Sequence, residues 1–144
     1  MIDGLIVTRL TQIKDERGKV MHMMRRDSPV FSEFGEIYFS TAHPGVIKAW
    51  HSHSKSTMNY TVVSGEAKFV FFDSRLDSPS QGEIQEIVIS PENYVLVSVP
   101  HNVWNGFKSI GSHEVIVANL TPFMHEPEDV SRIPFNSPDI QYKW

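Results

Sequence analysis

The chain has 144 residues, which is enough for one domain with a sizeable core. Its formal net charge of −4 argues against a nucleic-acid partner, which needs a basic face, but leaves room for a single anionic ligand. The absence of cysteine excludes a disulfide framework, a thiolate nucleophile and a cysteine-zinc site. No apolar run approaches a membrane span and no signal-peptide pattern opens the chain, so we expect a cytoplasmic protein without a membrane partner.

Short apolar and aromatic runs between turn signals predict strands and no long helix. In chain order the predicted strands cover residues 5–7, 19–24, 34–40, 46–53, 60–63, 67–73, 84–89, 94–99, 103–107 and 114–120. Many short strands at regular spacing favour an all-β sandwich or barrel. Residues 121–144 hold four prolines and little periodicity, so we expect one domain over 1–144 with an irregular tail and one helical turn near 126–131.

The most informative stretch is residues 45–65, GVIKAWHSHSKSTMNYTVVSG. His51 and His53 lie two apart in a β-prone segment, so their side chains are expected on one face of a strand. Two imidazoles in one space suit either metal ligation or general base catalysis near neutral pH. Both readings stay open here, beside the plainer one of histidines without a chemical task.

The same segment resembles the metal-cupin motifs G-x5-H-x-H-x(3,4)-E-x6-G and P-x-G-x2-H. The first motif matches at its glycines and histidines: Gly45, His51, His53 and Gly65. Its glutamate falls on Met58, and the histidine of the second motif falls on Asn105. A metal site of this kind would use His51, His53 and Asn105, with two usual ligands missing, so we expect no bound metal and no cofactor.

A closer resemblance is to the dTDP-4-dehydrorhamnose 3,5-epimerase family, a cupin group without a metal. Residues 15–18 resemble its D-x-R-G motif, 46–51 its V-L-R-G-L-H, 62–65 its V-V-R-G, 73–82 its D-L-R-x-x-S-P-x-x-G, 100–107 its P-x-G-F-A-H-G-F and 142–144 its terminal tryptophan segment. The resemblance runs from about residue 5 to the end of the chain. It implies a double-stranded β-helix jelly roll (cupin barrel), a nucleotide-sugar substrate and a homodimer.

The resemblance places the family's catalytic base on His51, while other functional positions differ. The family's phosphate-binding arginine falls on Lys48, its active-site lysine on Met58, its catalytic tyrosine on Val117, and the aspartate that pairs with the base near Ser137. The chain therefore keeps the scaffold and the base but not the family's proton donor. Cupin 3,4-ketoisomerases of dTDP-4-keto-6-deoxyhexoses carry H-A-H-K, which is similar to residues 51–55, so ketoisomerisation stays open.

The function predicted from these residues is a nucleotide-sugar epimerase or isomerase of deoxysugar and polysaccharide biosynthesis, acting on a dTDP-4-keto-6-deoxyhexose. His51 would remove a proton next to the ketone, His53 would orient it, shuttle a proton or hold a phosphate, and Tyr60 would replace the missing donor. The substrate-binding candidates are Arg17, Lys48, Met58, Arg75, Trp104 and Asn105. The alternatives are a metal-dependent cupin enzyme and a non-catalytic carbohydrate-binding cupin.

Overall fold

A computed structural model describes all residues from 1 to 144. It is an all-β protein, as predicted. The elements are β1 (Ile6–Arg9), β2 (Gln12–Asp15), β3 (Gly18–Met21), β4 (Glu36–Ala42), β5 (Ile47–His53), β6 (Met58–Ser64), β7 (Ala67–Asp73), β8 (Ile84–Ile89), β9 (Val95–Val99), β10 (Val103–Ser109), β11 (Val115–Thr121), the 3-10 helix η1 (Pro127–Asp129) and β12 (Val130–Arg132). None of these elements is a helix long and apolar enough to cross a membrane.

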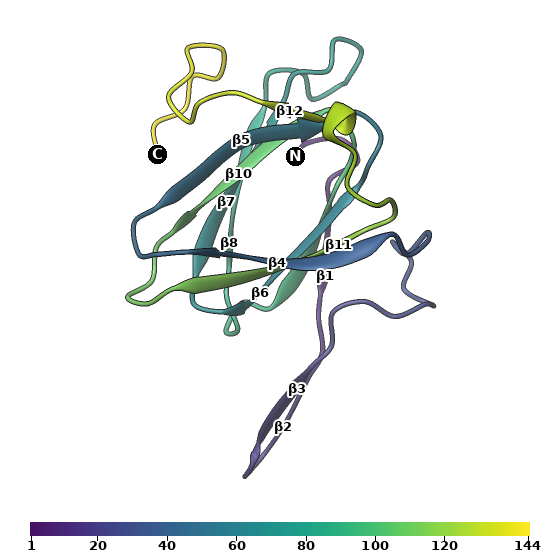
Figure 1. Ribbon diagram of the computed structural model, residues 1–144, viewed down its shortest axis with the longest axis vertical. Helices are drawn as coiled ribbons and strands as arrows, with labels where there is room; N and C mark the ends of the chain where they lie inside the picture. Colours follow the sequence, from purple (N-terminus) through teal and green to yellow (C-terminus); the bar gives the residue numbers. More distant parts are fainter.

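Two five-stranded sheets face each other and form the jelly-roll barrel (Figure 1). One sheet has the order β1-β9-β6-β11-β4 and the other the order β12-β5-β10-β7-β8. The core between them is made of apolar side chains from both sheets, such as Val62, Phe69, Val97 and Phe107. Burial of these alternating residues is what holds the sheets together.

Strand β5 contains an irregularity that decides which of its side chains point inward. Asn105 of β10 pairs with His51, and Phe107, two residues later, pairs with Lys48, three residues earlier. The extra residue of β5 is a bulge, which re-aims the side chains on one side of it. Lys48 therefore shares the inner face with His51 and His53, although simple alternation would put it on the opposite face.

Gly106 lies opposite this bulge, where β10 approaches β5 most closely. A Cβ atom added to Gly106 would lie 2.3 Å from the Cβ of Ala49, which no real pair of side chains tolerates. We expect Gly106→Ala to lower the free energy of unfolding by about 1–3 kcal/mol, because β5 must move away from its neighbour. Urea denaturation measures this change.

Gly111→Ala is the matched control, since its added Cβ would meet nothing nearer than 3.5 Å. Equal midpoints for the two variants would contradict the account of the close approach at Gly106.

Two segments lie outside the barrel proper. The β2–β3 hairpin projects from one end (Figure 1), and β2 was not predicted because its sequence, QIKD, has a single apolar residue. The tail beyond residue 121 is less irregular than expected, since it contains η1 and β12. Strand β12 pairs antiparallel with β5, so that Arg132 lies opposite His51.

Candidate active site

The inner faces of β4, β5, β6, β11 and β12 enclose a cavity of about 520 Å³. Both walls of the barrel contribute, because β5 and β12 belong to one sheet and β4, β6 and β11 to the other. The lining includes His51, His53, Lys48 and Tyr60, four residues that the sequence nominated. A concave site with few convergent polar groups is the usual form of a small-molecule site.

His51 is held by a hydrogen bond between its Nε2 atom and the hydroxyl of Tyr60, at 2.9 Å. Tyr60 is fully enclosed on β6, in the wall opposite His51. The ring of His53 stands edge-on to the ring of His51, with centroids 5.6 Å apart. The strand-face prediction that joined the two histidines therefore describes their arrangement correctly.

Burial keeps the His51 imidazole neutral at physiological pH. Removal from water lowers the pKa of His51 to about 3, and the positive charges of His53 and Arg132 act in the same direction. Burial also lowers the pKa of His53, against the opposing effect of Asp129. A neutral imidazole is the form that can accept a proton, so His51 is in the protonation state that a base requires.

The same shift predicts a pH-dependent stability. The unfolded chain protonates His51 near pH 6.5, whereas the folded chain does so near pH 3. The contribution of His51 to stability is therefore complete above pH 6.5 and is lost progressively as the pH falls toward 3. Between pH 7 and 5 the free energy of unfolding of the native protein should fall by up to about 2 kcal/mol more than that of His51→Asn. Urea denaturation at the two pH values measures this difference.

His113→Asn removes an exposed loop histidine and serves as the control. The stability of His113→Asn should depend on pH as that of the native protein does. If its stability depends on pH as weakly as that of His51→Asn, the effect does not come from His51.

The charged side chains of the cavity are all basic. Lys48 and Arg132 line it, and no aspartate or glutamate does. Lys48 donates a hydrogen bond of 3.2 Å from Nζ to the hydroxyl of Ser40 on β4. In a chain with a net charge of −4, this concentration of positive charge favours an anionic ligand.

Two polar residues of the opposite sheet complete the lining. Tyr38 on β4 and Asn119 on β11 are cross-strand partners, and both line the cavity. The Nδ2 atom of Asn119 donates a hydrogen bond of 2.7 Å to the Tyr38 hydroxyl. Neither residue was nominated from the sequence.

Comparisons with known proteins now bear on this site. The family model for dTDP-4-dehydrorhamnose 3,5-epimerase matches residues 1–144. The chain belongs to this family. The membership confirms the predicted resemblance and, with it, the expectation of an isomerase of the epimerase type.

Individual relatives agree with the family assignment. The chain is 32% identical to the spore coat polysaccharide biosynthesis protein SpsL of Bacillus subtilis strain 168, covering 100% of this chain and 97% of that protein. It is 33% identical to the probable low-salt glycan biosynthesis epimerase Agl13 of Haloferax volcanii, over 90% of this chain and 86% of the other. The crystal structure of a dTDP sugar isomerase from Desulfovibrio desulfuricans G20 superposes with a TM-score of 0.97 at 40% identity, covering 99% of this chain and 92% of that chain.

Two positions matched to family residues lie in the barrel core and not in the cavity lining. Met58 is 2% exposed and packs among apolar side chains of both sheets. Asn105 is 1% exposed, and its amide donates to the backbone carbonyls of His51 and Val103, each at 3.3 Å. We assign neither residue a substrate contact. Asn105 does not line the cavity with His51 and His53, so it is not placed as a third metal ligand.

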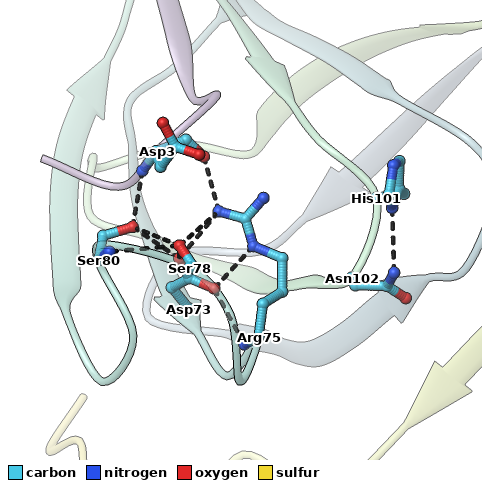
Figure 2. A network of polar contacts seen from close by, with 7 residues as sticks. All are labelled: Asp3, Asp73, Arg75, Ser78, Ser80, His101 and Asn102. Atoms are coloured by element: carbon cyan, nitrogen blue, oxygen red, sulfur yellow. Dashed lines mark hydrogen bonds and ion pairs between the residues drawn. The ribbon is translucent and has the colours of Figure 1, made fainter.

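Arg75 belongs to a structural network of polar contacts (Figure 2) and does not line the cavity. Its guanidinium donates to the buried carboxylate of Asp73, from Nε and Nη2, both at 2.8 Å. Ser78 and Ser80 donate to the same carboxylate, and Arg75 also donates to the Asp3 carbonyl at 2.7 Å. The family's D-L-R-x-x-S-P resemblance thus falls on a turn that ties the N-terminal segment to the loop between β7 and β8.

The two remaining substrate-binding candidates also lie outside the cavity. Arg17 is at the turn of the β2–β3 hairpin, where it pairs with Asp15. Trp104 points to the outer face of β10 and packs in a cluster around Trp50 and Ile140. Inner and outer side chains alternate along β10, so Trp104 faces away from Asn105 and the barrel interior.

Proposed function

We propose that the chain epimerises a dTDP-linked 4-keto-6-deoxy sugar during polysaccharide biosynthesis, with His51 as the base. The observation that carries the proposal is a neutral histidine in a cavity whose charged groups are all basic. The names of the relatives support the substrate class, since they include a dTDP sugar isomerase and a spore coat polysaccharide protein.

The chemistry follows from the acidity of carbon next to a ketone. His51 accepts the proton of that C–H bond, and the bonding electrons move onto the ketone oxygen to give an enolate. Lys48 and Arg132 supply positive charge for the enolate oxygen and for the diphosphate of the nucleotide. Return of a proton to the opposite face of the carbon completes the inversion, with no oxidant or reductant consumed.

Solvent exchange tests this proposal directly. The native protein is incubated in heavy water with a panel of dTDP-4-keto-6-deoxyhexoses, and the sugars are then analysed by NMR. We expect deuterium at the carbon next to the ketone, together with an inverted product. Tight binding of a panel member without exchange at any C–H position would favour the carbohydrate-binding alternative, and movement of the keto group would indicate ketoisomerisation.

The metal-dependent alternative has little support in the geometry. No group of three or more His, Asp or Glu side chains is placed to hold a metal ion. Metal analysis of the purified protein separates the two readings. About one tightly bound transition metal per chain, lost in His53→Ala, would favour the metal enzyme.

We also propose that the protein is a homodimer. Apolar side chains are exposed on the projecting hairpin, at Ile13 and Val20, and on the outer face of β4, at Ile37 and Phe39. Ile13 and Val20 are cross-strand partners, and exposed apolar pairs of this kind are typical of an interface. Sedimentation velocity should give a dimer that Phe39→Asp weakens, and a native monomer at micromolar concentration would contradict the proposal.

A further inference from the structure

The proposed reaction needs a group that returns a proton to the carbon, and the family's catalytic tyrosine position falls on Val117 in this chain. Val117 lines the cavity on β11 and supplies no proton. The lining holds two tyrosines, Tyr38 and Tyr60, and their hydrogen bonds differ in a way that separates their roles.

The hydroxyl of Tyr60 is already engaged. Its contact is with His51 Nε2 at 2.9 Å, and the residue is 5% exposed. In one tautomer of His51 the hydroxyl donates to the ring, and in the other it accepts from the ring. Only the second tautomer leaves Nδ1 of His51 free to accept a proton. In that tautomer the Tyr60 hydroxyl also keeps its own proton, so the two tyrosines differ in their partners: Tyr60 is bonded to the ring of the base, and Tyr38 is bonded to Asn119.

The hydroxyl of Tyr38 keeps its proton free. The Oδ1 atom of Asn119 accepts from the backbone N–H of Asn59 at 3.1 Å, which fixes the orientation of the amide because a backbone N–H can only donate. The Nδ2 atom of Asn119 must then face Tyr38, where it donates at 2.7 Å. The Tyr38 oxygen is the acceptor in this bond, so its own proton is available to the cavity.

The position of Tyr38 also suits inversion. Tyr38 is on β4, in the sheet opposite the one that holds His51 on β5, and both side chains line the same cavity. A substrate between the two walls presents one face to each. Burial raises the pKa of Tyr38, so the phenol stays protonated, while the Asn119 bond favours the phenolate that forms when the proton leaves. The charges of Glu36 and Arg132 act on this pKa in opposite directions.

We propose that Tyr38 is the proton donor of the reaction and that Tyr60 positions His51; this assignment rests on the proposed function. His51 takes the C–H proton on one face, and the Tyr38 O–H bond breaks as the new C–H bond forms on the other face. The tyrosinate and the imidazolium return to their starting forms by proton exchange with solvent.

The test compares Tyr38→Phe with Tyr60→Phe in heavy water, with a dTDP-4-keto-6-deoxyhexose that the native protein inverts. In Tyr38→Phe the base still works, so His51 returns a solvent deuteron to the same face. We therefore expect deuterated starting sugar of unchanged configuration, while inverted product falls by about 10²–10⁴-fold. In Tyr60→Phe exchange and inversion should fall together, and the ¹⁵N shifts of the His51 ring should report a changed tautomer.

Tyr94→Phe is the matched control, because Tyr94 is a buried tyrosine outside the cavity lining. It should exchange and invert as the native protein does. Inversion by Tyr38→Phe at the native rate overturns the donor role, and a split between exchange and inversion in Tyr60→Phe assigns that role to Tyr60. Absence of exchange in the native protein with every panel sugar overturns the proposed function instead.

Discussion

Replacement of His51 by asparagine is expected to reduce turnover by about 10²–10⁴-fold, because it removes the imidazole that we propose as the base and that the Tyr60 hydroxyl contacts. Asparagine keeps a polar group of similar width and cannot take up the proton. Deuterium exchange next to the ketone should stop together with product formation. Binding of dTDP, measured by calorimetry, should change little, since Lys48 and Arg132 stay in place.

The pairing of readouts makes this prediction specific. Loss of exchange with retained dTDP binding separates a missing base from a collapsed cavity, and His113→Asn provides the unaltered reference at an exposed loop. If His51→Asn exchanges the substrate proton at the native rate, another group is the base and the mechanism is wrong.

Asp73→Asn is expected to destabilise the fold by about 3 kcal/mol, the lower part of the range for breaking a buried charge pair, because Arg75 is partly solvated. The Asp73 side chain is 0% exposed and that of Arg75 is 21% exposed. The guanidinium of Arg75 holds the pKa of Asp73 far below its usual range, with further help from Ser78 and Ser80. This stabilisation is present above about pH 4, where the unfolded chain is ionised, and is lost as the pH falls below that value.

Thermal unfolding at pH 7 measures the effect, and Asp77→Asn, an exposed acid of the same loop, is the control. Turnover well below the melting temperature should be unchanged, since no residue of the network lines the cavity. Equal melting temperatures for Asp73→Asn and Asp77→Asn would show that the buried pair contributes no stability. A selective loss of dTDP binding in Asp73→Asn would restore a ligand role for this loop.

Most of the fold was readable from local patterns, because alternation and turn residues mark strands directly. Two strands, β2 and β12, were not predicted. Their sequences are charged or short, and the rest of the barrel decides how they pair. Arg132 was not predicted as a site residue for the same reason, since only the antiparallel register of β12 places it opposite His51. The family resemblance predicted Lys48 as a site residue. Simple strand alternation would place it on the face opposite His51, and the bulge in β5 explains why it lies on the same face.

The tyrosine of β4 illustrates a signal that was present and could be misread. Ile37 and Phe39 alternate with Tyr38 and Ser40, and the apolar pair would ordinarily be assigned to the interior. In the structure Phe39 is 61% exposed, whereas Tyr38 and Ser40 line the cavity. A strand that lines a polar site on one side and presents an apolar surface on the other reverses the usual assignment. Arg17 and Arg75 each follow an aspartate by two residues, Asp15 and Asp73, and each arginine forms an ion pair with that aspartate. The short spacing was the sequence signal that these arginines have a partner within the chain.

Strand β12 has one more consequence. Its three residues, Val130–Arg132, occupy the backbone groups on the outer side of β5, and the exchange between Trp50 and Ile133 extends this cover by another pair of hydrogen bonds. A strand without such a neighbour is an open template for pairing with other chains. Release of the tail would turn β5 into the free edge of its sheet, so the strand that carries His51 would become open to pairing with other chains.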